Sequence, residues 1–524
     1  GSITTHTPWT RNIIYLLSGL VYVRSGAVLT IEPGTIIKGD KTTKGSLIVE
    51  PGGQIFAEGT VTQPIVFTSN EPAGNRQRGG WGGLIVLGRA PVNLAGTPTI
   101  EGGVGSTYGG NLPNDNSGVL RYVRIEFSGT PFQPNSEING LTLGGVGAGT
   151  TIDHIQVHSN GDDSYEFFGG TVNAKYLISN SATDDDFDAD NGYTGRVQFG
   201  LAIRGANVAD VSGSTAFESD TANGGSNNTP QPAPVFSNMT ALLQNRTATA
   251  NFTRAMHLRR NTGISIFNSV FSGWPQGLFI DGAAAQANAT NGTLVLRNNV
   301  LAGNTVAYGA NPTTGFTHAA YFEDAGRGNQ VFADASALGL NPDNYNDFNS
   351  NGTPNGVPSL ALPGSSVLRS GASFTDAKLT GNGNGGPNST FDVVNYRGAF
   401  GPDSSPDANW ATGWTNFNPQ ITCYNAPGLT LSTRSASDQL RQLAVVPNPS
   451  SGPAELRFNL QRGSAASVRV FDLTGREVAT VLAAGKLTAG DQIVQLPANL
   501  QAGVYLATVT TNETSQSVRF VVVN

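Results

Sequence analysis

Short apolar runs, each ended by Gly, Pro, Asn or Ser, recur along the chain between residues 29 and 304. The first are LTIEPGTIIKG (29–39), LIVEPGGQIFAEG (47–59) and PIVFTSN (64–70). The turn Glu32-Pro33-Gly34 soon returns as Glu50-Pro51-Gly52, and we interpret the spacing of these two turns as a structural repeat. No helix fits between runs this close together. Strand-sized runs at a fixed spacing predict an all-β chain folded as a right-handed parallel β-helix, in which each coil stacks on the previous one.

Many of the predicted strands end in Asn or Ser, as in KYLISNS (175–181), SIFNSVFSGW (265–274) and LVLRNNVLAGN (294–304). Equivalent positions on stacked coils lie one strand spacing apart, about 4.8 Å. We therefore expect Asn and Ser at the corners to hydrogen-bond to the like residue one coil away.

The strand pattern loosens after about residue 305, where Gly, Pro and Asn become frequent and alternation is lost. We expect long excursions from the solenoid there, followed by a few final coils. VVNYRGAF (393–400) and NWATGWTNFNPQITCYN (409–425) are predicted to form an aromatic plug over the last coil. The predicted β-helix domain covers residues 1–424.

A separate small β-sandwich is predicted for residues 445–524, after a polar linker over residues 425–444. Its predicted strands include SVRVFDL (467–473) and GVYLATVTT (503–511). Turn residues separate these strands at regular spacing, which is typical of a sandwich.

The composition excludes some classes of function. The net charge is −7, so the chain lacks the excess of positive charge that is typical of nucleic-acid-binding proteins. No apolar run reaches the roughly 18–20 residues needed for a transmembrane segment. The single cysteine, Cys423, excludes a disulfide within the chain, and we predict it to be a small core residue.

The stretch TDDDFDADNGYTG (183–195) concentrates acidic residues in a chain that is only 13% charged. Residues 162–166 and 184–188 are both acidic, and the spacing between them is a plausible coil length. Carboxylates stacked on adjacent coils repel one another. Calcium, which takes six to eight oxygen ligands, would replace this repulsion by attraction of the carboxylates to the ion. The predicted ligands are Asp162, Asp163, Glu166, Asp184, Asp185, Asp186, Asp188 and Asp190. Turn-capping on a solvated face and a catalytic or ligand-binding role stay open as alternatives.

Parallel β-helices also host polysaccharide lyases, which need calcium-binding aspartates and an Arg or Lys as base. The candidate bases are Lys175, Arg196, Arg204 and Arg259, all on or beside predicted strands. Trp81 and Trp274 are either sugar-binding platforms or packed corner residues. The sequence contains no recognisable lyase or hydrolase motif beside these candidate residues, and fold analogy alone is a weak argument for function.

The C-terminal region resembles the type A C-terminal sorting domain of the bacterial type IX secretion system. The resemblance is carried by VVPNPSSGPAELRF, VRVFDLTGREVATV and LQAGVYLATV. The matching positions are Pro447, Asn448, Pro449, Asp472, Gly475, Arg476, Gly503 and Tyr505. It implies a secreted protein of the cell surface in a Bacteroidota-type bacterium, with the type IX secretion machinery as a partner.

The N-terminal region is similar to β-helix regions of cell-surface proteins that carry this sorting domain. The similarity rests on LTIEPGTIIKGD, GGWGGLIVLGRAPVN, DDSYEFFGGTVNAKYLIS and DDDFDADNGYTGRVQFG. Asp220-Thr221-Ala222 also matches the short acceptor pattern for O-glycosylation in such bacteria, which makes Thr221 a candidate acceptor.

We therefore expect a secreted structural or adhesive protein without enzymatic activity. In this interpretation it is a calcium-stiffened rod that self-associates into filaments or a surface layer. Two alternatives stay open: a carbohydrate-binding surface module that contacts a cell-surface or extracellular polysaccharide, and a calcium-dependent polysaccharide lyase.

Overall fold

The computed structural model divides the chain into two compact units, Gly1–Leu431 and Ser432–Asn524. Each unit has its own apolar core. The structure describes residues 1–133, 136–221, 225–243, 251–310, 315–340, 358, 360–428, 440–460, 463–472, 476–511 and 515–523.

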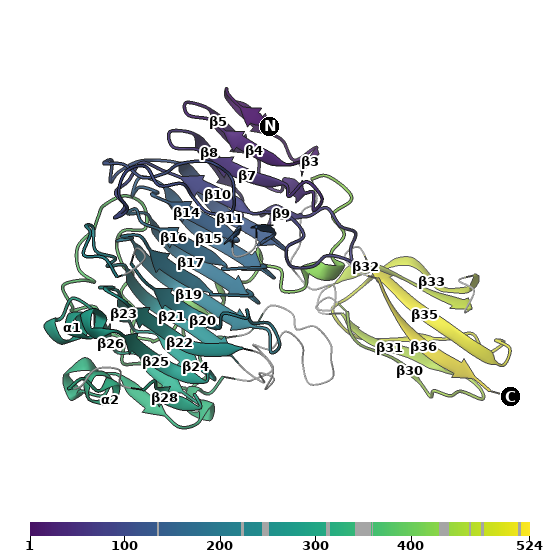
Figure 1. The fold of residues 1–524 in the computed structure, drawn as a ribbon. Helices are drawn as coiled ribbons and strands as arrows, with labels where there is room; N and C mark the ends of the chain where they lie inside the picture. Colours follow the sequence, from purple (N-terminus) through teal and green to yellow (C-terminus); the bar gives the residue numbers. More distant parts are fainter. Residues whose placement is uncertain are drawn as a thin grey trace. The chain divides into compact units, whose positions relative to one another are not determined.

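The first unit is built on two long parallel sheets whose strands stack from the N-terminal coils to the C-terminal coils (Figure 1). Sheet A consists of β1 (Ser2–Ile3), β4 (Leu20–Val23), β7 (Ser46–Val49), β10 (Leu84–Leu87), β14 (Leu141–Gly144), β16 (Tyr165–Phe168), β18 (Phe187–Asp190), β20 (Ser214–Ser219), β22 (Phe252–Arg259), β25 (Gln276–Asp281) and β28 (Val306–Tyr308). The main path of sheet B consists of β2 (Thr7–Trp9), β5 (Val28–Ile31), β8 (Gln54–Glu58), β11 (Gly118–Glu126), β15 (Thr151–His158), β17 (Asn173–Asn180), β19 (Arg196–Arg204), β21 (Val235–Leu243), β24 (Val270–Ser272), β27 (Val300–Ala302) and β29 (Gln330–Phe332). Sheet B is extended by β3 (Ile14–Leu17), β6 (Ile36–Gly39), β9 (Ile65–Ser69), β23 (Ser265–Phe267) and β26 (Val295–Arg297). The predicted parallel β-helix is confirmed.

Strand pairing gives the register of the coils. Tyr165 pairs with Phe187 and Glu166 with Asp188, so residues 162–166 and 184–188 occupy equivalent places on adjacent coils. The predicted register of the acidic segments is therefore confirmed. Near the N-terminus Leu20 pairs with Ser46, which makes that coil longer. Coil length varies because the turns absorb extra residues while the paired strands stay short.

The two Glu-Pro-Gly turns, 32–34 and 50–52, lie at different corners of the solenoid. The backbone N–H of Gly26 donates to the carbonyl of Gly52 one coil on, at 2.8 Å. Gly34 instead donates to the carbonyl of Gln63, at 3.0 Å. The repeat predicted from the spacing of these turns is therefore wrong: the two turns share a sequence because both follow a short strand.

Side chains in sheet A alternate between the solenoid interior and its outer face, as expected for strands. Tyr165 and Phe187 stack inside the core with ring centroids 5.3 Å apart. Their neighbours Glu166 and Asp188 pair in register on the opposite, outer face. This alternation places the acidic residues of β16 and β18 in one row outside the core.

One corner of sheet B consists of residues in the left-handed backbone region, namely Tyr122, His154, Tyr176 and Phe199. Bulky residues seldom adopt this conformation. Here the rings stack from coil to coil, with centroids 4.4, 4.3 and 5.1 Å apart along the row. Stacking between coils thus offsets the local backbone cost at each coil.

The predicted hydrogen bonds between corner Asn and Ser residues are confirmed. The backbone N–H of Ser269 donates to Oδ1 of Asn299 at 3.0 Å, and the N–H of Asn299 donates to Oδ1 of Asn329 at 2.8 Å. Each residue in this ladder lies 30 positions after the previous one, so the ladder follows the coils.

Residues 360–424, called the strap below, cover the outer face of sheet B. Leu379 joins an apolar cluster with β23 and β26, Trp414 joins one with β17 and β19, and Tyr424 joins one with β6 and β9. The strap therefore runs back toward the N-terminal coils. The predicted aromatic plug over the last coil is wrong, because a row of apolar outward-facing residues along sheet B binds these aromatic side chains instead.

Helical segments in the first unit are short and lie in the turns. They are α1 (Ala283–Asn291), α2 (His318–Phe322) and the 3₁₀ segments η1 (Ala325–Arg327), η2 (Ala335–Leu338), η4 (Val367–Arg369), η5 (Pro406–Asn409) and η6 (Pro419–Ile421). A two-stranded antiparallel pair, β12 (Pro131–Gln133) and β13 (Ser136–Glu137), lies between β11 and β14. Among the described helices, none combines the length and apolar character needed to cross a bilayer.

The second unit consists of two antiparallel sheets around an apolar core. One contains β30 (Leu440–Val446), β31 (Glu455–Leu460) and β34 (Gly490–Gln495). The other contains β33 (Glu477–Leu487), β32 (Ser464–Asp472), β35 (Gly503–Thr511) and β36 (Ser515–Val522). β30 begins inside the predicted linker 425–444, of which residues 429–439 lie outside the described residues.

Candidate functional site

The acidic cluster forms where the chain enters β16 and β18, two neighbouring strands of sheet A. The preceding turns carry Asp162 and Asp163 on one coil and Asp184 on the next. Glu166 and Asp188 then follow on the strands and pair in register. The register of the two coils thus brings together five of the eight predicted ligands.

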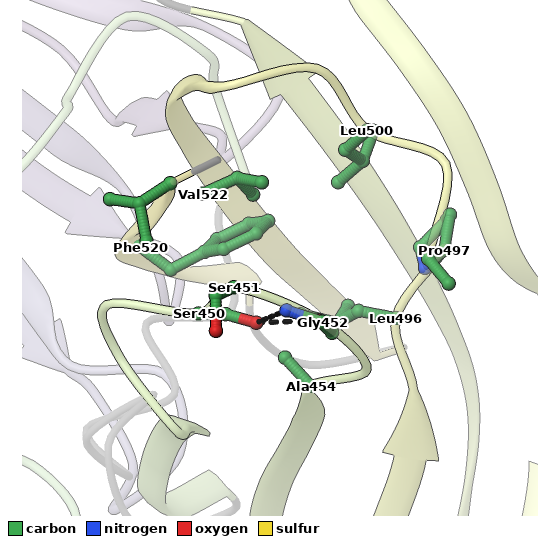
Figure 2. Close-up of a pocket in the computed structure, with 11 residues that line it drawn as sticks. Ser450, Ser451, Gly452, Ala454, Leu496, Pro497, Leu500, Phe520 and Val522 are labelled. Atoms are coloured by element: carbon green, nitrogen blue, oxygen red, sulfur yellow. Dashed lines mark hydrogen bonds between the residues drawn. The ribbon is translucent and has the colours of Figure 1, made fainter.

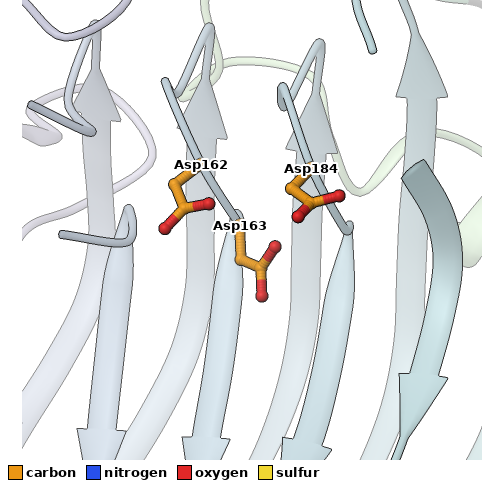
Figure 3. A group of neighbouring side chains, drawn as sticks. All are labelled: Asp162, Asp163 and Asp184. Atoms are coloured by element: carbon orange, nitrogen blue, oxygen red, sulfur yellow. The ribbon is translucent and has the colours of Figure 1, made fainter. Parts of the chain in front are cut away.

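Three of these carboxylates, Asp162, Asp163 and Asp184, form a group called the turn triad below. One oxygen from each lies within 4.8 Å of the others. Figure 3 shows Asp162 and Asp184 at equivalent places on adjacent coils, with Asp163 between them. Asp163 is buried, while Asp162 and Asp184 are half-buried.

A second group, called the strand triad, consists of Asp163, Glu166 and Asp188. Their oxygens also lie within 4.8 Å of one another. Glu166 accepts a hydrogen bond from the side-chain amide of Asn139. Oδ1 of Asp188 is buried, and no donor among the described residues reaches it.

Burial raises the pKa of every carboxyl in the two triads, and the neighbouring carboxylates raise it further. The pKa of Asp184 rises to about 7. Those of Asp162, Asp163, Glu166 and Asp188 lie well above their usual range. Such shifts mean that the fold holds more negative charge here than its own cations compensate.

The remaining predicted ligands do not belong to either triad. Asp185 is buried, and its Oδ1 accepts a hydrogen bond from the backbone N–H of Thr215 at 2.6 Å. Asp190 lies at the far end of β18, where burial raises its pKa to about 6.

Asp186 points into the interior, and its Oδ1 lies 3.3 Å from Nη1 of Arg204. Both side chains are fully buried. The structure therefore does not bring Asp186 to the other predicted ligands. Asp186 lies in the turn just before β18, where the alternation of the strand does not yet apply, and it turns inward to the buried guanidinium of Arg204.

Sequence analysis did not find Glu101, Asn139 and Asp210 as neighbours of the cluster. Asn139 donates to Oε1 of Glu101 at 2.7 Å as well as to Glu166. Asp210 and Asp184 both accept from the hydroxyl of Ser212. These residues come from loops whose path over sheet A has no signature in the sequence.

One coil further, the acidic row of sheet A is compensated by cations. Glu218 pairs in register with Asp188 and accepts hydrogen bonds from His257 and Arg259. Burial alone would raise the pKa of Glu218, but the His257 hydrogen bond and the Arg259 charge lower it below its usual value. The contrast with the triads shows that a neighbouring cation lowers the pKa of a carboxyl that burial would otherwise raise.

The candidate bases are engaged in structural contacts. Nζ of Lys175 lies 2.7 Å from Oδ2 of Asp392, and Arg196 donates to four carbonyls of the strap between residues 378 and 389. Arg204 pairs with Asp186 inside the solenoid. Arg259 pairs with Glu218 and Asp220, which raise its pKa.

Predictions for four single residues can be compared with their positions in the structure. Trp81 and Trp274 are fully buried in the core, as expected for packed corner residues. Cys423 is exposed, so its predicted place in the core is wrong; only the neighbouring Tyr424 turns inward. Thr221 is fully buried and its hydroxyl accepts a hydrogen bond from Asn93 at 3.0 Å, which argues against its glycosylation on the folded chain.

The sorting-motif residues lie in the second unit. Pro447, Asn448 and Pro449 follow β30, Gly503 and Tyr505 lie on β35, and Arg476 donates to Asp472 at 3.0 Å. Gly475 lies outside the described residues. Figure 2 shows a hollow in this unit lined by Ala454, Leu496, Leu500, Phe520 and Val522. The segments that follow Pro449 and precede Gly503 therefore meet around one hollow, which Ser450 and Ser451 also line.

Solved structures that are similar to this chain include a pectate lyase and a phage tailspike protein. The crystal structure of the pectate lyase Pel9A is similar over 73% of this chain and 89% of its own, with 15% identity and a TM-score of 0.38. Full-length tailspike protein 2 from Escherichia coli O157:H7 bacteriophage CAB120 is similar over 96% of this chain and 64% of its own, with 12% identity and a TM-score of 0.22. No curated protein matches the chain.

Two family models match. The secretion system C-terminal sorting domain matches residues 444–524, which confirms the resemblance found in the sequence. This tail indicates export to the cell surface or the extracellular space by type IX secretion, and it implies contact with that machinery and an origin in Bacteroidota. The pectate-lyase like beta helix domain matches residues 1–338, and the chain therefore belongs to this β-helix family.

Proposed function

We propose that this exported protein is a calcium-binding structural or adhesive component of the cell surface. The observation that carries the proposal is the pair of carboxylate triads across two adjacent coils. Among the described residues, no Lys, Arg or His forms an ion pair with any of the five carboxylates in these triads. A hard cation with oxygen preference matches this donor set.

Calcium at this place would join one coil to the next. Without a cation, carboxylates at equivalent places on adjacent coils repel across about 4.8 Å. With a bound divalent ion, the same carboxylates attract the ion from both coils. Binding to the folded chain alone stabilises it by mass action, so calcium would stiffen the solenoid where its own charges oppose stacking.

The surroundings of the candidate bases support a structural role. Lys175 and Arg196 hold the strap against sheet B, and Arg204 neutralises Asp186 in the interior. A base for proton abstraction needs access to the substrate. In these positions the side chains serve packing and charge pairing.

The ends of the solenoid support self-association. In the part of the chain that the structure describes, β1 pairs only with β4 and β28 only with β25. Unpaired strand edges offer backbone groups to another chain. Contact between the first and last coils of successive molecules would generate a filament.

Calcium binding is tested on the purified full chain by equilibrium dialysis followed by elemental analysis. The Asp184→Asn variant should bind less calcium than the wild type, whereas Asp403→Asn, an exposed aspartate of the same unit, should bind the same amount. Electron microscopy with and without calcium then tests assembly. Absence of bound calcium in the wild type would contradict the proposed calcium binding. Dispersed particles both with and without calcium would contradict the proposed filament assembly.

Calcium-dependent binding or cleavage of an acidic polysaccharide is the second candidate. It is favoured by the position of Arg259 and Arg260, which follow the acidic row on sheet A two coils beyond β18. Incubation with polygalacturonate and calcium tests it. New unsaturated chain ends would support a lyase, and retention on immobilised polymer without cleavage would support a binding module.

A further inference from the structure

We propose that the hollow in the second unit is the place where the type IX secretion machinery binds the chain, by inserting one uncharged side chain of its own. The sorting domain implies contact with that machinery. The proposal assigns this contact to one surface of the folded unit. It does not depend on the proposed calcium function.

The hollow is built from segments that lie far apart in the chain. One side comes from residues between 450 and 454, and another from residues between 496 and 500. The strand β36 contributes Phe520 and Val522 (Figure 2). Such a surface exists only in the folded unit, so a partner that fits it distinguishes a folded sorting domain from an unfolded one.

Asn448 of the Pro-Asn-Pro motif fixes the end of β36 beside the hollow. Its side-chain amide donates to the carbonyl of Arg519 at 3.1 Å, and its Oδ1 accepts from the backbone N–H of Val521 at 2.9 Å. The N–H of Ser450 donates to the carbonyl of Val521 at 2.9 Å, and the carbonyl of Ser450 accepts from the N–H of Val523 at 2.8 Å. These backbone groups of β36 are therefore not available for pairing with an added strand, and a partner must bind here through side chains.

A second motif residue supports the same place from the core. The ring of Tyr505 packs against the ring of Phe520, with centroids 5.6 Å apart. The Tyr505 hydroxyl donates to the carbonyl of Gln501 at 2.9 Å, just after the segment that lines the hollow. Two motifs that lie far apart in the sequence, and on which the resemblance to the sorting domain rests, therefore hold one hollow in shape.

The hollow has an apolar floor and a more polar rim. Ala454, Leu496 and Phe520 are almost fully buried, whereas Ser451 at the rim is exposed and Val523 is 42% exposed. None of the described residues that line it carries a charge. A charged group placed there would lose water without gaining an ion pair. Pockets of this kind receive the anchor side chains of protein interfaces, which supply most of the binding energy.

The test is export of the full-length chain from a Bacteroidota host that has the type IX machinery, measured as the fraction of the chain outside the cell. Ala498→Trp would fill the hollow from its exposed rim, and Val523→Asp would place a charge there. Each should reduce the exported fraction roughly tenfold or more, as expected when an interface loses an anchor contact. The matched controls are Ile493→Trp and Ile493→Asp, since Ile493 is 59% exposed in the same unit and does not line the hollow.

The melting temperature of each purified full-length variant, followed by circular dichroism, separates loss of recognition from loss of folding. Reduced export with an unchanged melting temperature, while the Ile493 variants are exported normally, supports the proposal. Export of Ala498→Trp and Val523→Asp at the wild-type level would overturn it. Equal losses for the Ile493 variants would also overturn it, because the hollow would then have no special part in export. If one of the two hollow variants fails to fold, the other decides.

Discussion

Oδ1 of Asp163 accepts a hydrogen bond from the backbone N–H of Asp185, 2.7 Å away on the next coil. Asp185 repeats the contact with the N–H of Thr215, one coil further, at 2.6 Å. This ladder of carboxylates on backbone amides ties three coils together. It also fixes acidic side chains one above another on adjacent coils.

Without calcium, the stability of the protein should fall as the pH rises. The pKa of Asp184 is raised from 3.8 to about 7, and that of Asp190 from 3.8 to about 6. A raised pKa contributes stability below the unfolded value, and this contribution is lost as the pH passes the folded value. In a chelator, the melting temperature should therefore decrease between about pH 5 and about pH 8.

Calcium should reverse this decrease, because the metal replaces the protons on the carboxylates. Scanning calorimetry at both pH values, with calcium and with chelator, measures the effect. We expect calcium to raise the melting temperature by several degrees at the higher pH and by less at the lower pH. Identical unfolding curves with and without calcium at about pH 8 would contradict calcium binding at the acidic cluster.

Substitution of Asp186 should destabilise the fold without changing calcium binding. Asp186→Asn leaves the fully buried guanidinium of Arg204 without its counter-charge. Breaking a buried pair in this way costs about 3–5 kcal/mol. Denaturant unfolding measures the cost, and elemental analysis checks that the bound calcium is unchanged.

The matched control for that variant is Asp403→Asn. Its partner is Arg369, and the side chains of Asp403 and Arg369 are 63% and 31% exposed. An exposed pair contributes about 1 kcal/mol or less. Similar losses for the two variants, or loss of calcium from Asp186→Asn, would show that Asp186 does not act as an interior counter-charge.

The strap should depend on one hydroxyl near its end. The Tyr424 hydroxyl donates to Glu126 at 2.8 Å and accepts from Arg124 at 3.0 Å, and all three side chains are buried. Tyr424→Phe should lower the free energy of unfolding by about 2 kcal/mol, because a buried carboxylate loses its hydroxyl donor and keeps only its other partners, such as Arg124.

Tyr308→Phe provides the comparison, since Tyr308 donates to Glu323 at 2.8 Å in an exposed place. Chemical denaturation of both variants should show the larger loss for Tyr424→Phe. If the two losses were equal, the buried contact would not anchor the strap.

Cys423 should react in the native protein. Its side chain is exposed, although the adjacent Tyr424 is fully buried. One equivalent of a maleimide should attach without denaturant, as measured by intact mass. Labelling that requires unfolding would place the thiol in the core and contradict the position of the strap end.

Local features of the sequence were sufficient to predict several parts of the structure. The spacing of Asp162 and Asp184 predicted the register of β16 and β18, and Pro447, Asn448 and Pro449 with the later motifs predicted the sorting domain. These succeed because they depend on neighbours along the chain or one coil away. The repeat expected from the two Glu-Pro-Gly turns failed because identical turns occur at different corners of one solenoid.

The sequence by itself determined the class of the fold, the presence of a second β unit, the export signal and the concentration of carboxylates. Tertiary structure alone decided which carboxylates meet. It turned Asp186 inward to Arg204, brought Asn139 to Glu166, and laid the strap along sheet B. The physical reason is that alternation and motifs are local, whereas the path of a loop or strap depends on which distant apolar and charged faces remain uncovered when the coils have stacked.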